Sequence, residues 1–380
     1  MNKVHTPLIK TAKKALEEIF LGDGYADKVV PRMLKENKKL GARDRAWIAE
    51  TVYELVRYWR KYLLLCKKEA ELTSDDIGQI IYFYLEHKND VYELSPEIEA
   101  SFPEWWHQRG MKELGDDWWD MMTALNKKAN TYIRLNRLVT QQKKMVDMFQ
   151  KEGVQAVAAE NVADAFELLS KNNLQSSNYY KYGWFEFQDI SSQQVGYFIG
   201  DTRGKQVLDA CAGAGGKTLQ LASLSNNSAK ITASDYHLSR LKLLEQRAER
   251  AGVRNLVLKM QEQLFSEAKQ FDIVLLDVPC SASGTLKRNP GLKWKLTEEE
   301  LNQQIKVQKD ILDQFCSLVK NGGTLIYVTC SIFPSEGEEQ IQSFLHNHQE
   351  FEKLEEKRIG LREDGGDGFY MAKMVRLGEE

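Results

Sequence analysis

The sequence has few features that would indicate a membrane, secreted or metal-dependent protein. No apolar run among its 380 residues could cross a bilayer, and residues 1–14 lack the apolar core of a signal peptide. Five scattered cysteines, an odd number, form no CxxC pair and argue against a disulfide framework. The histidines offer only the pair His346 and His348 in a polar stretch, which is not a metal-ligand pattern. We therefore expect a cytoplasmic protein with reduced thiols, no membrane and no metal.

The charge is unevenly distributed, although the formal net charge is only −3. Residues 1–70 hold 16 Lys and Arg against 9 Asp and Glu, whereas residues 71–120 hold 3 against 13. A basic block beside an acidic block indicates an oriented surface. The basic block would suit a polyanion such as RNA, and a solvated helical face explains it equally well, so both interpretations stay open.

Residues 1–125 have the periodicity of a helical domain. Ile48, Val52 and Leu55 recur at helical spacing, and Asp44 is placed to cap that helix. We assign the tryptophan pairs at 105–106 and 118–119 to packing between helices rather than to base stacking. We find no catalytic pattern in this stretch.

Residues 126–190 read as a small α+β segment. Residues 132–136 alternate like a strand, 141–152 are helical, 154–157 are strand-like and 163–169 look helical. Such βα units often form RNA-binding platforms, although any small α+β linker would read the same. An excess of basic residues, 9 against 5 over residues 127–181, favours the platform.

From residue 191 onward the chain reads as a doubly wound α/β domain. Short apolar strands alternate with helices, which predicts a mixed, mostly parallel sheet of the Rossmann type. The expected strands are 206–208, 231–233, 271–276 and 324–328, and the expected helices are 217–224, 238–251 and 301–319.

A loop of small residues follows the first of these strands. A P-loop would need glycine where Cys211 stands, and a dinucleotide fingerprint would need glycine at Thr218, so both motifs fail. S-adenosylmethionine needs only close backbone approach and carboxylates for its ribose and amino groups. Asp235, at the end of the second strand, lies where an acid would hold the ribose. The loop residues that we assign to this cofactor are Cys211, Ala212, Gly213, Ala214, Gly215, Gly216 and Lys217.

Two cysteines follow neighbouring strands at the same sheet edge. Cys280 comes after the strand that ends at Asp277, and Cys330 follows the next strand. Both should face the ligand crevice, because ligands bind at the carboxyl ends of parallel strands. The chemistry that needs this arrangement is methyl transfer to C5 of a pyrimidine: a thiolate adds to C6 and makes C5 nucleophilic. Asp277 could neutralise the ring near N3, and Lys217 could hold a thiolate and orient Asp277.

These motifs resemble those of RNA cytosine-5 methyltransferases of the RsmB/NSUN family, most closely the bacterial enzymes that act on small-subunit ribosomal RNA. They occur in family order over residues 188–373, and paired PC and TC motifs are highly specific to that family. The matching pieces are residues 187–193, 211–218, 277–285, 288–290, 293–294, 322–331, 366–370 and 372–373.

The resemblance implies roles that chemistry alone leaves open. Cys330, in the TC motif, matches the nucleophile, and Cys280, in the PC motif, matches the residue that assists product release. Asp277 matches the residue that binds the cytosine edge beside the cofactor. The loop of residues 211–217 and Asp235 match the cofactor contacts.

The chain departs from the family pattern in two places. Ala214 stands where the family commonly has proline, which should only loosen the turn. The position where the family has an acid that contacts the adenine corresponds to Gln261 in this chain, or to Glu262 if the alignment gap is moved by one residue. A glutamine amide oxygen can still accept a hydrogen bond from the adenine amino group. Residues 1–125 weakly resemble a NusB-like RNA-binding domain. We also predict phosphate contacts by Arg288 and Lys293, although each could equally be a surface charge without RNA contact.

Three functions remain in view at this stage. The leading one is S-adenosylmethionine-dependent C5 methylation of small-subunit ribosomal RNA, with tRNA as an alternative substrate. A non-catalytic RNA-binding assembly factor is a second class, and the two intact thiols argue against it. An NTPase is disfavoured by Cys211 in the broken P-loop.

Overall fold

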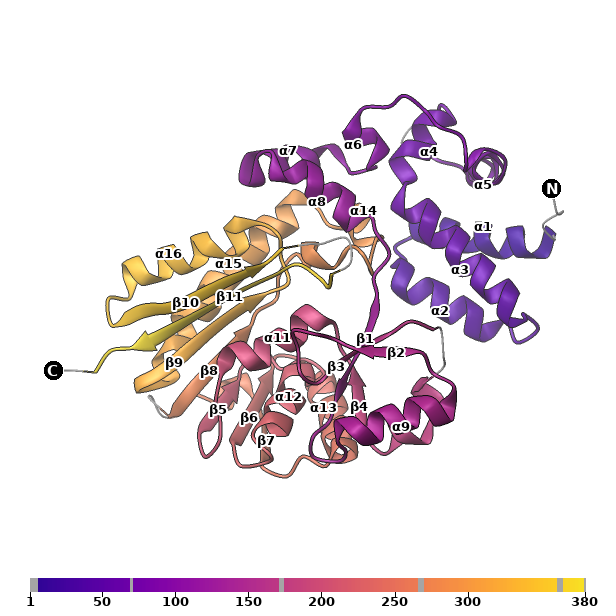
Figure 1. The fold of residues 1–380 in the computed structure, drawn as a ribbon. Helices are drawn as coiled ribbons and strands as arrows, with labels where there is room; N and C mark the ends of the chain where they lie inside the picture. The colour runs from indigo at the N-terminus through magenta and orange to yellow at the C-terminus, as the bar shows by residue number, and fades with distance from the viewer. Residues whose placement is uncertain (1–5, 69–70, 171–173, 266–269, 361–364, 379–380) are drawn as a thin grey trace. The chain divides into compact units, whose positions relative to one another are not determined.

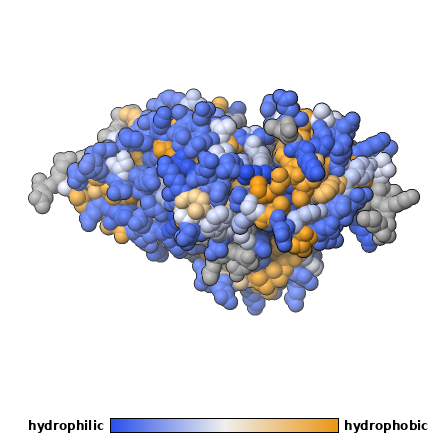
Figure 2. All heavy atoms as spheres, turned by 90° about the horizontal axis from the view of Figure 1, so that it is seen from above, coloured by the Kyte–Doolittle hydropathy of each residue, from blue (hydrophilic) through white to orange (hydrophobic). Residues whose placement is uncertain are grey.

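The chain divides into two compact units in a computed structural model that describes residues 6–68, 71–170, 174–265, 270–360 and 365–378 (Figure 1). The first unit comprises Met1–Lys128 and Thr285–Glu300, and the second comprises Ala129–Gly284 and Leu301–Glu380. On the face drawn in Figure 2, hydrophilic side chains predominate, with hydrophobic patches between them. Within the described ranges, none of the helices combines the length and the apolar character that crossing a membrane requires.

The first unit is helical, as the periodicity predicts. Apolar side chains fill its interior, among them Leu16, Val52 and Ile77, and Trp106 and Trp118 are fully buried. The packing role predicted for the tryptophans is therefore confirmed for these two. The helices are α1 (Thr6–Phe20), α2 (Ala26–Glu36), α3 (Ala42–Arg57), α4 (Trp59–Leu65), α5 (Ser74–His87), α6 (Pro96–Glu99), α7 (Glu104–Leu114), α8 (Asp117–Leu125) and α14 (Leu292–Lys295).

The start of α3 corrects one prediction. Gly41 occupies the N-cap position, and Asp44 lies inside the first turn, where its carboxylate accepts a hydrogen bond from the Gly41 backbone N–H at 3.3 Å. Asp44 still satisfies an unpaired donor at the helix start, but not as the cap residue.

The second unit begins with a four-stranded antiparallel sheet in the order β2-β3-β1-β4. The helix predicted over 163–169 is wrong: β3 pairs with β1 on one side and β2 on the other, and Phe166 is buried opposite Ile133. Pairing with distant strands overrides the local helical pattern. The elements are β1 (Thr131–Leu135), α9 (Gln142–Glu152), β2 (Ala156–Ala158), β3 (Ala165–Leu168), η1 (Leu174–Ser176), α10 (Asn178–Lys181) and β4 (Phe185–Phe187).

A seven-stranded sheet in the order β10-β11-β9-β8-β5-β6-β7 forms the rest of the second unit. Strands β5 to β9 are parallel, and β10 and β11 add an antiparallel edge, as expected for a mixed, mostly parallel sheet. The strands are β5 (Gln206–Asp209), β6 (Lys230–Asp235), β7 (Leu256–Met260), β8 (Phe271–Asp277), β9 (Val319–Thr329), β10 (Phe351–Ile359) and β11 (Phe369–Arg376).

Helices cover both faces of this sheet. Along β8, Ile273 and Leu275 pack with α11 and α12, whereas Val274 and Leu276 pack with α15 and α16, as the alternation of strand side chains requires. The predicted helix 301–319 ends earlier, at Phe315. The remaining elements are α11 (Ile190–Ile199), α12 (Gly216–Leu224), α13 (Leu238–Ala251), η2 (Gln261–Gln263), η3 (Ser283–Thr285), α15 (Glu298–Phe315), η4 (Cys316–Leu318), η5 (Pro334–Glu336) and α16 (Glu338–Asn347).

Candidate active site

The loop between β5 and α12 presents backbone to open space. Gly213 and Gly215 have φ angles of +54° and +88°, in the left-handed region that favours glycine. A Cβ on Gly215 would lie 2.7 Å from the Leu244 side chain, so only glycine fits there. A Cβ on Gly213 would meet no heavy atom within 4 Å. A ligand can therefore approach the backbone at Gly213.

Asp235, at the end of β6, is tied to this loop. Its Oδ2 accepts a hydrogen bond from the Gly213 N–H at 3.0 Å, and its Oδ1 accepts one from the His237 N–H at 2.8 Å. The residue is only 4% exposed. Each oxygen keeps a second lone pair for a hydroxyl ligand. Asp235 thus shapes the loop as well as offering acceptors.

Gln261 lies beside the same loop, and Glu262 is exposed. The Gln261 amide nitrogen is 3.5 Å from the Ala210 carbonyl oxygen, which follows β5 directly. Between the two residues that the sequence left open, this position favours Gln261 as the neighbour of a ligand held by the loop.

Lys217 and Asp277 form an ion pair at the carboxyl ends of the strands. The Lys217 Nζ lies 2.7 Å from the Asp277 Oδ2, and the side chains are 12% and 29% exposed. Burial alone lowers the pKa of Lys217, but the charges of Asp277, Cys330 and Asp209 outweigh burial and raise its pKa above the ordinary value. The Lys217 ammonium therefore stays charged in a site that contains both a carboxylate and a thiol.

Two further titratable groups behind the loop have raised pKa values. Burial is the main cause that raises the pKa of Asp209 to about 7, although the Thr218 hydroxyl donates a hydrogen bond to its Oδ2 at 2.6 Å. Burial likewise raises the pKa of the Cys211 thiol far above its ordinary value. Cys211 is therefore a weak nucleophile at neutral pH, and its role in the loop is steric.

Cys280 and Cys330 meet because β8 and β9 are parallel neighbours that end together. Their sulfur atoms are 3.4 Å apart, and both side chains are partly exposed. The hydrogen bond to Cys330, followed by burial, raises the pKa of Cys280 well above its ordinary value. Ala282, two residues after Cys280, has a φ of +53°, so the loop holds a non-glycine residue in a strained conformation. We call Cys280, Cys330, Lys217 and Asp277 the cysteine site.

A buried polar network beneath the cysteine site escaped the sequence analysis. Ser281 and Ser331 directly follow the two cysteines, and both hydroxyls donate hydrogen bonds to the Glu336 carboxylate, which is 0% exposed. Gln308, from α15, donates to the same carboxylate at 2.9 Å. The only available signal was the repeated Cys-Ser pair, since a single glutamate in a polar stretch has no diagnostic spacing.

The predicted phosphate contacts lie elsewhere, in the first unit. Lys293 is 1% exposed, and its Nζ lies 3.2 Å from the Asn126 Oδ1, 3.4 Å from the Ala100 carbonyl oxygen and 4.3 Å from the centre of the Phe102 ring. We call these four residues the lysine cluster. Because the ammonium is enclosed by helices, this structure argues against the predicted contact of Lys293 with RNA. Arg288 is partly exposed.

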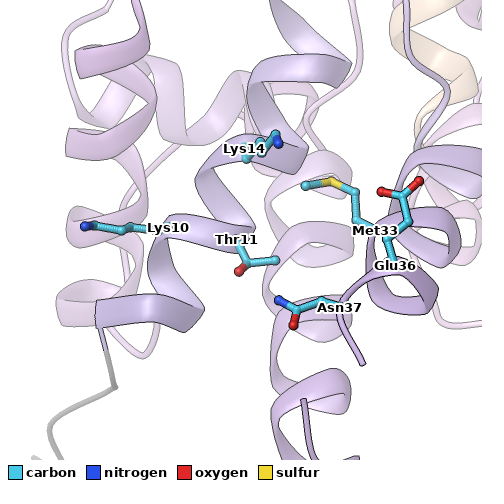
Figure 3. Close-up of a pocket in the computed structure, with 6 residues that line it drawn as sticks. All are labelled: Lys10, Thr11, Lys14, Met33, Glu36 and Asn37. Carbon is cyan, nitrogen blue, oxygen red and sulfur yellow. The ribbon is translucent and has the colours of Figure 1, made fainter. Parts of the chain in front are cut away.

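Part of the basic block lines a surface pocket of about 410 Å³ in the first unit (Figure 3). The lysines come from α1, and the opposite wall comes from α2 and the residue after it. The mixture of two lysines with a glutamate gives the pocket no single charge. Its lining residues are Lys10, Thr11, Lys14, Met33, Glu36 and Asn37.

Comparison with known families gives two matches on this chain. Residues 198–375 match the family described as 16S rRNA methyltransferase RsmB/F. Residues 102–175 match the ferredoxin-like domain described as RsmF/B-like. The first match contains the whole seven-stranded sheet except the last residue of β11, and it contains the cysteine site.

Known proteins show the same similarity. Ribosomal RNA small subunit methyltransferase B from Photorhabdus laumondii is 32% identical over 284 residues, 72% of this chain and 66% of the relative, so this match spans just under two thirds of the relative. The protein of that name from Escherichia coli O6:K15:H31 is 30% identical over 301 residues, covering 75% of this chain and 70% of its own length.

Two solved structures share the fold. The crystal structure of PH0851 covers 99% of this chain and 100% of its own chain, with a TM-score of 0.84 and 24% identity. A methyltransferase homolog protein from Pyrococcus horikoshii covers 74% of this chain and 98% of its own chain, with a TM-score of 0.66 and 25% identity.

Proposed function

Because the chain belongs to the RsmB/F family of 16S rRNA methyltransferases, we propose that it methylates C5 of a cytosine in RNA, with S-adenosylmethionine as methyl donor. The observation that carries the choice of C5 is the pair of thiols 3.4 Å apart beside the Lys217–Asp277 ion pair. A second thiol beside the first has no role in direct methylation of a nitrogen or oxygen. The names of the relatives support small-subunit ribosomal RNA as substrate.

The residues around the glycine loop fit S-adenosylmethionine. The cofactor carries no phosphate, so a loop without P-loop or dinucleotide spacing can hold it by backbone approach at Gly213. Asp235 would accept from the ribose hydroxyls, and Gln261 would accept from the adenine amino group through its amide oxygen. When bound, the cofactor supplies an electrophilic methyl group on a positively charged sulfur.

In this proposal Cys330 is the nucleophile. Its thiolate forms a bond to C6 of the cytosine, and the electrons of the C5–C6 double bond move into the ring and make C5 nucleophilic. The Lys217 ammonium favours the thiolate by its charge. A proton shared along the Lys217–Asp277 pair stabilises the charge that develops at N3.

Release reverses the addition. After C5 is methylated, a base takes its remaining proton, the electrons of that C–H bond form the C5–C6 double bond again, and the bond between Cys330 and C6 breaks with its electron pair returning to the Cys330 thiolate. Cys280 lies next to the departing sulfur and assists this step. Attack on C6 requires access to the face of the base, so the target cytosine must be unpaired or flipped out of a helix. We assign RNA binding to residues 1–125 and 126–190 flanking the catalytic domain of residues 191–380.

Methyl transfer from labelled S-adenosylmethionine tests the proposal. The acceptors are total RNA and small ribosomal subunits from a strain that lacks the gene, and 5-methylcytosine is then mapped. Label at a small-subunit ribosomal cytosine supports the proposal. Label in tRNA keeps the reaction but corrects the substrate. Label on another atom refutes C5 methylation, and absence of cofactor binding supports the assembly-factor alternative.

A further inference from the structure

One buried carboxylate connects the two loops that carry the thiols. The Glu336 Oε1 accepts hydrogen bonds from the Ser281 backbone N–H at 2.8 Å and from the Gln308 amide at 2.9 Å. Its Oε2 accepts from the Ser281 and Ser331 hydroxyls. The four donors are all uncharged, so this carboxylate is satisfied by hydrogen bonds and not by an ion pair.

We propose that Glu336 is a positioning residue for the reaction of the cysteine site. It holds the loops of Cys280 and Cys330 in register, and its carboxylate, 2.8 Å from the Ser281 backbone nitrogen, places a negative charge against the loop of Cys280. The inference rests on the proposed function for its catalytic consequence only, since the contacts and the charge are properties of the structure.

Two of the residues that donate to Glu336 are the direct neighbours of the two cysteines in the chain. Ser281 and Ser331 are each covalently next to a cysteine, and Ser283 links them, with its hydroxyl 2.9 Å from that of Ser281 and 3.0 Å from that of Ser331. Displacing either loop would leave a buried carboxylate or hydroxyl without a partner, which is unfavourable. By binding the residues next to both cysteines, Glu336 therefore holds the two sulfur atoms at their distance from each other.

The two thiols interact with different charged groups. Cys280 contacts Cys330 and interacts electrostatically with Glu336 and Tyr327, and the hydrogen bond to Cys330, burial and the charge of Glu336 all raise its pKa. On the other side, Cys330 interacts with the Lys217 ammonium. Two chemically identical groups thus have opposite charges beside them, which gives a physical reason for their different roles.

The test measures the reactivity of each thiol and catalysis separately in three variants of the full chain. Glu336→Gln removes the charge and keeps the shape, and Glu336→Asp keeps the charge but cannot reach all four donors. Glu339→Gln is the matched control, because Glu339 is an exposed carboxylate on the adjoining helix. Alkylation of Cys280 and Cys330 by iodoacetamide is followed by mass spectrometry from pH 6 to 10, without RNA or cofactor.

We expect Glu336→Gln to shift the alkylation profile of Cys280 by about one pH unit to lower pH, or roughly tenfold in rate at pH 8, and to leave the profile of Cys330 in place. Glu336→Asp should keep the wild-type Cys280 profile but lower kcat at least tenfold with KM unchanged. Glu339→Gln should match the wild type in both assays.

Three results would overturn the inference: equal shifts for both thiols in Glu336→Gln, no shift at all, or wild-type kcat in Glu336→Asp. If Glu336→Gln does not fold, Ser331→Ala removes one of the four hydrogen bonds to Glu336, together with the contacts of the Ser331 hydroxyl with Ser283 and the Phe333 N–H. It should lower kcat severalfold without moving the Cys280 profile; wild-type kcat there would also refute the inference. A failure of the proposed function would appear differently, as no methyl transfer by the wild type, and the alkylation profiles would still decide the role of the charge.

Discussion

The cysteine site in the second unit and the lysine cluster in the first each contain one buried lysine, and the pKa values of the two lysines are shifted in opposite directions. Lys217 lies 2.7 Å from the Asp277 carboxylate, and its pKa is raised. The Lys293 Nζ has the neutral oxygens of Asn126 and Ala100 as hydrogen-bond partners and lies 4.3 Å and 5.4 Å from the ring centres of Phe102 and Trp294. Burial, with a smaller contribution from the charge of Arg57, lowers its pKa well below the ordinary value.

The two lysines differ in the role that they can have as well as in the charge around them. A buried lysine with a carboxylate keeps a cation where a reaction can use it, whereas a buried lysine among neutral groups has a lowered pKa and serves packing. Burial of a titratable group is therefore no sign of function by itself. The sign at the cysteine site is that several groups of opposite charge converge on two thiols.

Of all substitutions in the two regions, those of the thiols should have the largest effect on methyl transfer. Cys330→Ala should reduce methyl transfer below detection, because the neighbouring thiol of Cys280 has a raised pKa and is a poor replacement for the nucleophile, and should form no covalent complex with RNA. Cys280→Ala should form the complex and fail to resolve it, so protein bound to RNA survives denaturing gels. The reverse pattern, with trapping in Cys330→Ala, would exchange the two roles.

The second effect in size should follow from Lys217→Met. Loss of the cation leaves Asp277 half-buried without its partner and removes the charge that favours the Cys330 thiolate, so kcat should fall by about a thousandfold. Although Lys217 belongs to the cofactor loop, its side chain pairs with Asp277 and the loop backbone is kept, so binding of S-adenosylmethionine, measured by calorimetry, should weaken far less than kcat falls. Retained binding separates a catalytic loss from misfolding. A loss of kcat below tenfold would end the contrast between the two lysines.

Sequence patterns predict those elements of this chain that depend on residues close together in the sequence. The strands β5, β6, β8 and β9 are visible because parallel strands buried on both faces read as short apolar runs. Strand β3 is missed because its pairing with β1 and β2 is between distant segments. Motifs with fixed spacing locate Cys280 and Cys330.

Burial in the tertiary structure explains the remaining misses. Glu336 has no spacing signature, because its four donors come from three separate segments. The residues next to Lys293 in the sequence do not distinguish it from an exposed lysine, so they do not reveal that helices enclose its side chain. A charged residue in the core is recognisable only when its partners are known.

Asp209 offers a smaller, pH-dependent test of the sheet edge. Its pKa is about 7 in the folded protein, against an ordinary value of 3.8, so the folded state retains a proton that the unfolded state releases between these pH values. The stability contributed by this group is complete below about pH 4 and is lost as the pH rises through 7. Asp209→Asn cannot titrate, so between pH 5 and 8 its free energy of unfolding should fall less than that of the wild type.

The gap between the two proteins should reach on the order of 2 kcal/mol at pH 8, as measured by urea unfolding. Asp201→Asn is the control, because Asp201 is an exposed carboxylate paired with Arg203. It should not reproduce the gap. Equal pH dependence in Asp209→Asn and the wild type would show that Asp209 is ionised in the folded protein.

Lys293→Met should have the smallest effect, and it sharpens the contrast with Lys217. Methionine keeps the length and the apolar stem of lysine, and the lost hydrogen bonds are to neutral acceptors, so methyl transfer should stay within about twofold of the wild type. The pKa of Lys293 is lowered in the folded state, so the unfolded state binds more protons between the two pKa values, and the wild type loses stability as the pH falls from the ordinary lysine pKa of 10.5 towards the folded pKa, below which the loss is complete. Lys293→Met should therefore gain relative stability toward low pH, as measured by urea unfolding at several pH values. If Lys293→Met instead folds normally but binds RNA more weakly and loses most methyl transfer, the RNA contact that the sequence predicts for Lys293 is supported.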